Sequence, residues 1–567
     1  MHREMERPLV GKNGCGKVAT KLTQRSGSHD APISYCDAIR RETIIAEQHR
    51  CGVSSNDPTL REQVVHNGHD AGELHPRRRA TAGQYTGSVQ TVALMDALGK
   101  PAAHSIKASH STPINDTSAM DGFAVCSAST VGASPEHPGT LRVVGVVAAG
   151  DKAEPERDLD RRAKDWTNDG TEIPVTCVEI MTGAKFPERT YPELDAVIKV
   201  EDVVIVEDGL GPETSYIAIC APVRAGQNRR YAGSDIAEGD LIVNAGERIE
   251  SKHIMALASL GLGRIEVATE LDVVASDLDL HALQETWKIG VLSTGSELVD
   301  LRSAPESAGL EVLEGTLPDS NGPYICSALR EMGPCYSVEH LGVVEDTEWA
   351  LEQSIRTAVQ ERCVDVLITT GGVSMGKFDF VRPVVEKRLG GAVVFHGVKV
   401  RPGLPVFFAW LDMGSIDAAT QRRNRTALFG LPGNPLAAAM ALRFFVVPYL
   451  ASLHGTAVPI SPSRCSAFFG PGRTMSSGLA NGEQCCDNQG RSRRKPEHLC
   501  AFWLGKLCCH GKEQAQADCV EVLEDQSSYK VGNLIGANCW VEVPEGVNAV
   551  VEGDRVTVHP FVHPACS

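Results

Sequence analysis

The sequence predicts a multidomain α/β plus β protein built around a central doubly wound parallel α/β domain. The chain has 567 residues, which is enough for roughly four domains at ~150 residues each. Between residues 286 and 457, apolar strand-like runs alternate with helical segments in the order that βαβ units require. The stretches 126–222 and 458–567 contain short extended runs separated by turns, which predict a small β-rich domain and a C-terminal β-barrel-like domain.

The composition is that of a folded, acidic protein. Hydrophobic residues make up 42% of the chain and charged residues 22%, and the formal charge is −17. A surface this negative repels polyanions, so we expect no nucleic-acid partner. The longest apolar run, 441–453, contains Arg443 and falls short of the ~18 residues that span a bilayer, so we expect a core helix and no membrane insertion. The polar N-terminus lacks the apolar segment of a signal peptide, which predicts a cytoplasmic, reducing location with free thiols.

The N-terminal part of the chain is predicted to alternate between irregular and regular segments. Residues 1–35 are polar and aperiodic and are interpreted as a disordered tail, and 52–88 as a loop insertion. From Val89 the pattern, with the run VALMDALG, favours a helix, whereas the alternation in LRVVGVVAAG (141–150) favours a strand. The charged run 154–165 mixes both signs, so we favour a solvated loop over a binding surface.

The elements of the α/β domain follow in order. Strands are expected at KIGVLST (288–294), DVLITT (365–370), AVVFHGVKV (392–400) and ALFGL (427–431), and helices near 323–332, 347–362, 381–389 and 435–453. Near the C-terminus, CWVEVP and DRVTVHPF predict strands of a small barrel or sandwich. Half of the cysteines lie from Cys465 onward, but adjacent cysteines cannot easily ligate one tetrahedral ion. We therefore favour irregular surface sequence over a zinc site in 470–515.

The loop after DVLITT is the first candidate for ligand binding, because open α/β sheets bind ligands beyond the carboxyl ends of their strands. Gly371, Gly372, Ser374 and Gly376 lie in this loop, where glycines let backbone N–H groups approach a phosphate. Asp379 follows shortly and suits either holding a divalent cation or positioning water. The alternative is a tight strand-to-helix turn without a ligand.

Two further loops place carboxylates at the same edge. The loop after KIGVLS carries Thr294, Gly295 and Glu297, and the loop PDSNGP carries Asp319 and Asn321. Asp319 has an alternative role as a helix cap only. Three carboxylates near a phosphate loop would repel the ligand unless a cation lay among them. The sequence therefore predicts a Mg²⁺ site formed by Glu297, Asp319 and Asp379.

The loop GLPGNP and a basic pair complete this edge. Pro432 and Gly433 precede Asn434, which we expect to be the N-cap of a helix that starts with proline and faces an anion. Lys399 and Arg401 suit recognition of an oxyanion, since a fixed arginine offers bidentate hydrogen bonds. The alternative for both cations is surface solubility.

Eight motifs carry a family resemblance. They are SAMDGFAV (118–125), IMTGA (180–184), AGQNRRYAGSDI (225–236), STGSEL (293–298), DSNG (319–322), TTGGVSMGKFDF (369–380), RPGLP (401–405) and GLPGNP (430–435). In this order the sequence resembles the molybdopterin molybdenumtransferases, the molybdenum insertases that include the E domain of gephyrin. The resemblance is strong over residues 85–460 and weaker towards the C-terminus.

The resemblance implies an elongated homodimer of four-domain subunits, with a linker and dimerisation domain over 36–125 and 223–285. The family's active site lies between the α/β domain of one subunit and the β-rich domain of its partner. Its reaction takes adenylylated molybdopterin and molybdate, releases AMP and inserts molybdenum, with Mg²⁺ as the expected metal. A separate molybdopterin adenylyltransferase would supply the substrate, because only one α/β domain of this type is expected here, and apo-molybdoenzymes would receive the product.

The resemblance also assigns residues. The acidic cleft positions of the family correspond to Asp121, Asp235, Glu297, Asp319 and Asp379. The loop that holds the pterin phosphate corresponds to Gly371, Gly372, Ser374 and Gly376, and the oxyanion pocket for molybdate to Arg401, Pro405 and Ser528. The remaining expected cofactor-binding residues are Thr294, Gly295, Asn321, Lys399, Pro432, Gly433 and Asn434.

Several positions depart from the family pattern. Many members have lysine at the position of Leu404 and arginine at those of Gly322 and Glu179; Arg401 replaces a lysine, Ala437 a serine and Cys500 an arginine. Losing a cation should weaken oxyanion binding, since each charge-assisted contact is worth ~1.5–3 kcal/mol. The alternatives to an active enzyme are therefore a scaffold that retains the fold and a carrier that binds molybdopterin without turnover.

Overall fold

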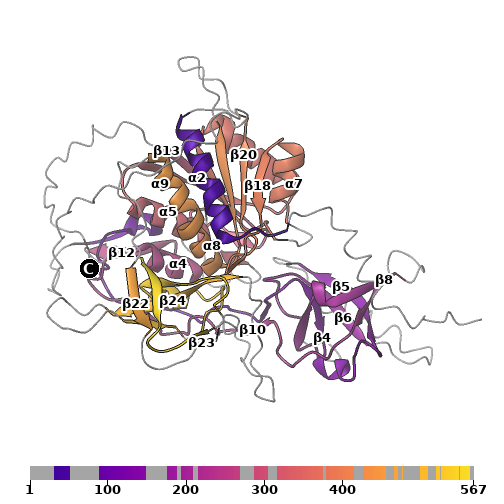
Figure 1. Cartoon of the computed structure of the whole chain (residues 1–567). Coiled ribbons are helices and arrows are strands. Elements are labelled where there is room, and N and C mark those ends of the chain that lie inside the picture. The colour runs from indigo at the N-terminus through magenta and orange to yellow at the C-terminus, as the bar shows by residue number, and fades with distance from the viewer. Residues whose placement is uncertain are drawn as a thin grey trace, which may run out of the picture. The chain divides into compact units, whose positions relative to one another are not determined.

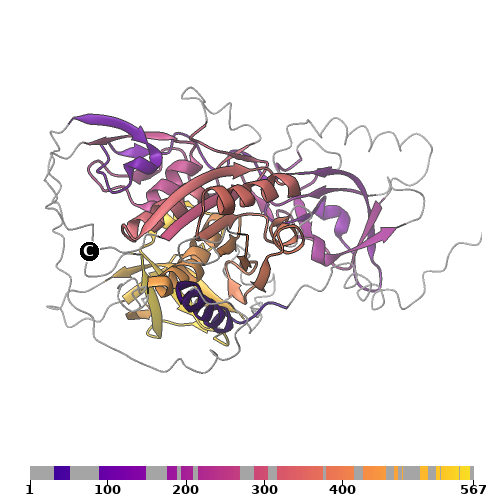
Figure 2. The ribbon, with the colours of Figure 1, turned by 90° about the horizontal axis from the view of Figure 1, so that it is seen from above.

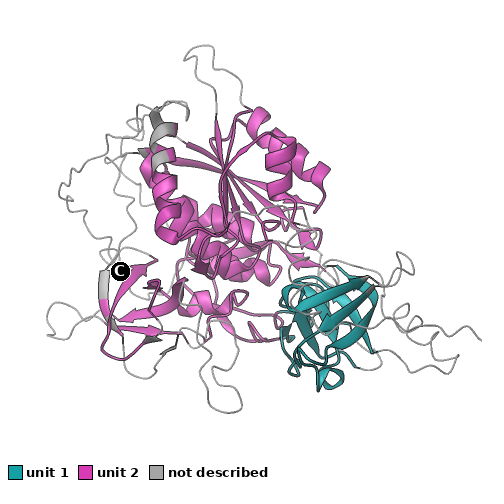
Figure 3. Cartoon of the chain, turned by 45° about the vertical axis from the view of Figure 1, so that its right-hand side comes forward, with its two compact units in different colours: residues 1–29, 113–232 teal, residues 30–112, 233–567 magenta. Residues whose placement is uncertain are grey.

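A computed structural model describes residues 31–51, 88–148, 175–187, 193–207, 215–268, 287–303, 316–374, 379–413, 425–454, 465–469, 475–476, 499–508, 519–523, 525–547 and 549–561. Most of the predicted tail and loop insertion, the charged run 154–165 and most of the cysteine-rich segment 470–515 lie outside these ranges. The chain forms two compact units: residues 113–232 belong to unit 1, and residues 30–112 and 233–567 to unit 2 (Figure 3).

Unit 1 contains one six-stranded sheet. Its strand order is β7-β4-β6-β5-β9-β8, and apolar clusters pack on both of its faces. The bounds are β4 Gly122–Val125, β5 Gly139–Val147, β6 Thr176–Ile180, β7 Ala196–Lys199, β8 Val203–Glu207 and β9 Ser215–Ile219. The strand predicted in LRVVGVVAAG is confirmed. The unit begins earlier than the predicted boundary at residue 126, because β4 lies inside this sheet between β6 and β7.

The α/β domain of unit 2 is a doubly wound sheet with the order β16-β13-β17-β21-β20-β18. The bounds are β13 Trp287–Thr294, β16 Tyr336–Val344, β17 Val366–Thr370, β18 Ala392–His396, β20 Phe407–Leu411 and β21 Thr426–Leu431. Strands β16, β13, β17 and β21 pair in parallel, as predicted, whereas β20 pairs antiparallel with both β21 and β18. The expected strand 392–400 is broken at Gly397, whose φ of 86° lies in the left-handed region, and β19 (Val400–Arg401) joins another sheet.

The helices of this domain agree with the predicted positions. They are α5 (Asn321–Glu331), α6 (Glu348–Arg356), α7 (Val381–Pro383) and the pair α8 (Pro435–Ala441) and α9 (Val447–His454), with π-helical segments following α6, α7 and α8. The helix expected from Val89 is wrong. Residues 89–93 form β1 (Val89–Ala93), which pairs with β12 (Arg264–Ala268), and only one 3₁₀ turn follows. Pairing with a strand distant in the sequence outweighs the local helical pattern here.

The helix that runs over Pro435–Leu453 has 19 residues and a mean hydropathy of 1.8, so by length and composition it is able to cross a membrane. This corrects the expectation that no apolar run approaches that length. The interpretation as a core helix is confirmed, because 78% of it is buried inside the protein. Tyr449 is completely buried there, against Phe408 and Phe429 of the sheet.

Helix α2 (Tyr35–Cys51) packs against α9, so this part of the predicted linker lies on the α/β domain (Figures 1 and 2). Ile33, at the end of the predicted disordered tail, is ordered: its N–H donates to Gly397 O at 3.1 Å and its carbonyl accepts from Lys399 N at 2.8 Å. Tyr35 contacts Phe445 of the core helix and Phe502 of the C-terminal domain. Helix α2 therefore joins two domains of unit 2.

The C-terminal domain is a closed β-barrel, as predicted. Its strand order is β19-β24-β25-β22-β28-β26, and pairing of β24 with β26 closes it. The bounds are β22 Cys465–Phe469, β24 Cys500–Cys508, β25 Cys519–Val522, β26 Cys539–Val543 and β28 Arg555–Pro560. Val400 and Arg401 of β19 pair with Cys500 and Ala501. The strand that bears the predicted oxyanion ligand is thus fixed to the barrel.

Candidate active site

Strand register brings the predicted loops to one edge of the sheet. Thr294 at the end of β13 lies opposite Val344, Ser293 opposite Thr370, and Thr370 opposite Leu431. Gly371 N donates to Leu431 O at 3.0 Å immediately beyond these ends. The predicted convergence of the loops that follow β13, β17 and β21 is confirmed.

Glycines let these loops approach each other closely. Gly371 and Gly372 have φ values of 86° and 64°, in the left-handed region. A Cβ on Gly371 would lie 2.6 Å from Thr294 O and 2.8 Å from Thr294 Oγ1. A Cβ on Gly433 would lie 3.6 Å from Gly371 Cα. Both the backbone conformation and the spacing therefore require glycine at position 371. Ser374 is exposed beside this loop, and Gly376 lies outside the described residues.

Two buried polar atoms at this edge have no hydrogen-bond partner among the described residues. They are the hydroxyl of Thr294 and Oδ1 of Asn321. The Asn321 amide is oriented by its Nδ2, which donates to Gly433 O at 2.8 Å. Buried polar groups are normally paired, so both atoms suit hydrogen bonds with a bound molecule.

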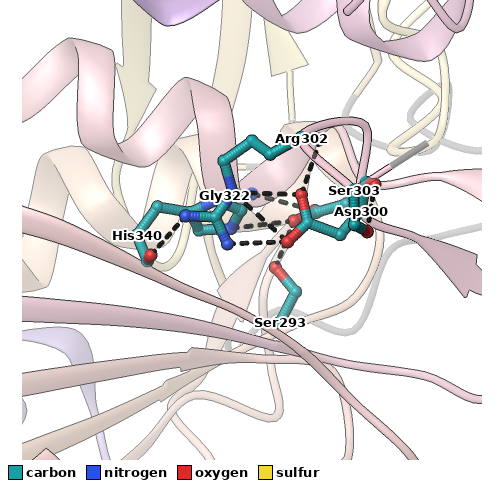
Figure 4. A network of polar contacts seen from close by, with 7 residues as sticks. Ser293, Asp300, Arg302, Ser303, Gly322 and His340 are labelled. Atoms are coloured by element: carbon teal, nitrogen blue, oxygen red, sulfur yellow. Dashed lines mark hydrogen bonds and ion pairs between the residues drawn. The ribbon is translucent and has the colours of Figure 1, made fainter. Parts of the chain in front are cut away.

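Asp319 was predicted as a catalytic and metal-binding carboxylate, and the structure favours the helix-cap alternative. Its side chain is only 2% exposed. Oδ2 accepts from Ser293 Oγ at 2.8 Å and faces His340 Nε2 at 3.1 Å, while Oδ1 accepts from Gly322 N at 3.0 Å. Figure 4 shows Ser293, Gly322 and His340 of this network beside Asp300 and Arg302. Both oxygens of this carboxylate therefore already accept hydrogen bonds from protein groups.

Glu297 lies beside a second acidic group. Gly295 has a φ of 156°, and a Cβ there would lie 2.8 Å from Glu297 Oε2. Burial, together with the negative charge of Asp346, raises the pKa of Glu297 to about 7. Asp346 Oδ2 accepts from Ser296 N at 3.3 Å, and burial also raises the pKa of Asp346. The sequence analysis missed Asp346, although its place just after β16 was a usable signal.

The predicted three-carboxylate metal site does not form among the residues that the structure describes. No group of three or more His, Cys, Asp or Glu side chains there is close enough to hold a metal ion. The carboxylate oxygens of Asp319 already accept hydrogen bonds from Ser293, Gly322 and His340. Asp379 follows the phosphate-type loop, which is closed by a hydrogen bond from Val381 N to Gly372 O at 3.1 Å. Of the three predicted metal ligands, Asp379 and Glu297 remain candidates, and Asp346 lies beside Glu297.

The other two predicted catalytic residues, Asp121 and Asp235, accept hydrogen bonds from neighbouring segments. In unit 1, Asp121 Oδ1 accepts from both N and Oγ1 of Thr182 at 2.7 Å, which joins the motifs SAMDG and IMTGA. In unit 2, Asp235 accepts from Val531 N at 2.8 Å and Gly532 N at 2.9 Å. Burial raises the pKa of Asp235 to about 6. Both carboxylates have structural contacts, and their catalytic role stays a prediction.

The predicted oxyanion residues lie where the barrel meets the α/β domain. The carbonyl of Ser528 accepts from Leu436 N at 2.8 Å, at the first turn of α8. Asn434 is the N-cap of that helix, as predicted, but its side chain makes no capping hydrogen bond. Pro432 and Gly433 precede it. The backbone of Lys399 links Ile33 to Cys500, and Pro405 lies beyond β19.

Burial gives a reason for two of the departures from the family pattern. Cys500 is 5% exposed in the core of unit 2, so a charged side chain would not reach solvent from there. A Cβ on Gly322 would lie 2.5 Å from Asp319 Oδ2 and closer still to His340 Nε2. Leu404 is 39% exposed, and Ala437 is buried in α8. Glu179 lies on β6 in unit 1. The structure gives no reason for Leu404, Ala437 or Glu179.

His396 on β18 is another residue that no motif indicated. Its Nδ1 lies 3.2 Å from Arg382 Nη1 and its Nε2 lies 2.7 Å from Val373 O. Because arginine can only donate, Nδ1 accepts and Nε2 carries the hydrogen that is donated to Val373. The imidazole therefore holds the loop that contains Gly371 and Gly372.

Three sequence families match the chain in order. They are described as MoeA N-terminal region (domain I and II) over residues 73–261, probable molybdopterin binding domain over 290–452, and MoeA C-terminal region (domain IV) over 501–561. The molybdopterin molybdenumtransferase of Synechococcus elongatus is 29% identical over 486 residues, which cover 83% of this chain and 94% of the relative. That of Bacillus subtilis is 30% identical over 375 residues, which cover 66% of this chain and 72% of the relative.

A crystal structure of the molybdopterin biosynthesis MoeA protein from Pyrococcus horikoshii OT3 aligns with 94% of this chain and 100% of its own, at 18% identity. Its TM-score is 0.35, too low to place the domains relative to one another. The doubly wound sheet with glycine loops at its carboxyl edge lies within the match to the probable molybdopterin binding domain, which places the chain in the class of multidomain proteins that contain this domain. Within that class, the chain belongs to the molybdopterin molybdenumtransferase family.

Proposed function

We propose that this chain acts in molybdenum cofactor biosynthesis as a molybdopterin molybdenumtransferase. The substrates are adenylylated molybdopterin and molybdate, and the products are molybdenum cofactor and AMP. One observation in the structure carries the proposal: Gly371 packs against Thr294 and Gly433 lies against Gly371, while the hydroxyl of Thr294 and Oδ1 of Asn321 are buried at this edge without a partner among the described residues. Backbone N–H groups of such loops suit a phosphate, and the two polar atoms suit the pterin.

The reaction has two parts that this site would serve. Water cleaves the phosphoanhydride of the adenylylated substrate, so that the phosphate stays on molybdopterin and AMP leaves. Each dithiolene thiol then replaces one oxygen of molybdate and gives up its proton, and two further protons from solvent let the two oxygens leave as water, with no change in the oxidation state of molybdenum. In our proposal Asp379 positions the attacking water or holds the metal, and Arg401, Lys399, Pro405 and Ser528 surround the molybdate.

Two of the three predicted carboxylate ligands suit Mg²⁺. Mg²⁺ usually keeps several waters and takes one or two carboxylates together with substrate phosphates. Asp319 is excluded because its oxygens already accept from three protein donors. Asp379 and Glu297 would hold the ion together with the phosphates, where it would neutralise charge on the leaving AMP.

The family suggests the partners and the location. We propose that the chain works as a homodimer in the cytoplasm, receives its substrate from a separate molybdopterin adenylyltransferase and delivers the product to apo-molybdoenzymes.

The test is molybdenum insertion in vitro. The purified chain is supplied with adenylylated molybdopterin, molybdate and Mg²⁺, and both AMP release and reconstitution of an apo-molybdoenzyme are measured. Asp379→Asn should abolish both while leaving the thermal unfolding midpoint unchanged, because it removes one loop charge. Asp96→Asn, at an exposed 3₁₀-helix position of the same unit, is the matched control. Molybdopterin binding without AMP release would support the carrier, and absence of both would support the scaffold.

A further inference from the structure

We infer that His340 is a positioning residue for this site, acting through Asp319, and that position 322 must be glycine because the His340 ring occupies the space of a side chain. His340 lies on β16, outside every motif of the family resemblance. The functional part of the inference rests on the proposed function, whereas the steric part does not.

The first step is the set of donors around Asp319. Its carboxylate and the His340 side chain are each only 2% exposed, and Nε2 lies 3.1 Å from Oδ2. Ser293 Oγ donates to the same oxygen at 2.8 Å. Two donors on Oδ2 and the Gly322 N–H on Oδ1 compensate the loss of water around a buried carboxylate. Removing His340 leaves this charge with one donor fewer and no solvent to replace it.

The second step is how Asp319 reaches the ligand-facing atoms. Ser293 immediately precedes Thr294, and Asn321 lies inside the turn that Asp319 closes on Gly322. These neighbours bear Thr294 Oγ1 and Asn321 Oδ1, buried polar atoms that have no partner among the residues the structure describes. Asp319 therefore fixes the end of β13 and the start of α5 relative to each other. A shift of this carboxylate would separate the two groups proposed to meet the pterin.

The third step is the fit between position 322 and the imidazole. A Cβ on Gly322 would overlap His340 Nε2 and lie 2.5 Å from Asp319 Oδ2. The φ of Gly322 is not in the left-handed region, so the need for glycine here is steric and not conformational. The His340 backbone is held, because Arg302 Nη1 donates to its carbonyl at 2.7 Å and Arg302 is paired with Asp300 (Figure 4), and its ring is only 2% exposed and lies against Asp319. Glycine at 322 and histidine at 340 thus depend on each other.

The functional experiment compares two substitutions of His340. His340→Leu keeps a side chain of similar size without a donor, and His340→Gln places an N–H near the position of Nε2. We expect His340→Leu to raise the Kd for molybdopterin, measured by isothermal titration calorimetry, and the KM for the adenylylated substrate by roughly tenfold or more, with a smaller change in kcat. His340→Gln should recover most of the affinity. His104→Leu, at a side chain 69% exposed in the same unit, is the control.

The steric experiment uses thermal unfolding and needs no ligand. Gly322→Ala alone should lower the unfolding midpoint by about 2 °C or more, because overpacking a filled core forces its neighbours to move. Adding His340→Ala should restore part of that loss. The destabilisation of the double variant should therefore be smaller than the sum of the destabilisations of the two single variants.

Each outcome decides one part. Equal affinities of the wild-type and His340→Leu proteins, or no advantage of Gln over Leu, would overturn the positioning role. Additive effects of Gly322→Ala and His340→Ala would overturn the steric dependence. A wild-type protein that neither binds molybdopterin nor releases AMP would defeat the proposed function and with it the positioning role, while the result at 322 and 340 would stand on its own. If His340→Leu fails to fold, His340→Met, which also lacks a donor, takes its place in the comparison with His340→Gln, and equal affinities of these two variants would overturn the positioning role.

Discussion

Replacing Gly371 by alanine tests whether close packing of the loops defines the site. Any residue with a Cβ loses about 1–2 kcal/mol in the left-handed conformation that Gly371 adopts. The added Cβ would also lie 2.6 Å from Thr294 O, a backbone atom that cannot rotate away. Overpacking of this kind costs about 1–3 kcal/mol. The sum is a destabilisation of about 2–5 kcal/mol, as well as a displaced phosphate loop.

Gly390 provides the matched control for this prediction. It has a φ of 65°, and a Cβ there would meet no atom within 4 Å. Gly390→Ala should therefore cost only the conformational part, about 1–2 kcal/mol. Thermal unfolding should place the midpoint of Gly371→Ala at least about 2 °C below that of Gly390→Ala, and AMP release should fall only in the former. Equal midpoints would show that the contact with Thr294 relaxes without cost and would refute the packing argument.

Three other predictions concern pH, the barrel and assembly. Glu297 has a pKa of about 7, so in the absence of Mg²⁺ its ionisation between about pH 6 and 8 adds uncompensated negative charge and should weaken binding of anionic molybdopterin; Glu297→Gln should flatten this dependence, and a flat wild-type profile without Mg²⁺ would contradict the assignment. Asp235→Ala should lower the unfolding midpoint read by intrinsic tryptophan fluorescence, because two backbone N–H groups lose their acceptor at about 1–3 kcal/mol each. Since the folded pKa of Asp235, about 6, exceeds its ordinary value of 3.8, the stabilisation tied to its proton is full below about pH 4 and is lost as pH rises through 6, a dependence that Asp235→Ala should remove. Light scattering should show a dimer, and a clean monomer would argue against a site shared between two subunits.

The class of fold and the ligand-binding edge of the sheet could be predicted from local sequence patterns. Apolar runs such as DVLITT, with helical segments between them, are local patterns that depend on few distant contacts. The glycines at 371 and 372 were likewise readable, because a left-handed backbone excludes most other residues. The N-cap position of Asn434 followed from proline at the next residue. These features were predicted because their physical cause lies within a few residues of chain.

Only the tertiary structure decided how several of these residues are used. Asp319 has the sequence context of a metal ligand, but Ser293 and His340, which are distant in the chain, fill one of its oxygens. Residues 89–93 carry a helical pattern, yet they form a strand because Arg264–Ala268 lies beside them. His396 and Asp346 occur in no motif, and only folding brings them to the loops. Burial and hydrogen-bond pairing depend on which segments meet in space, and a linear pattern does not contain that information.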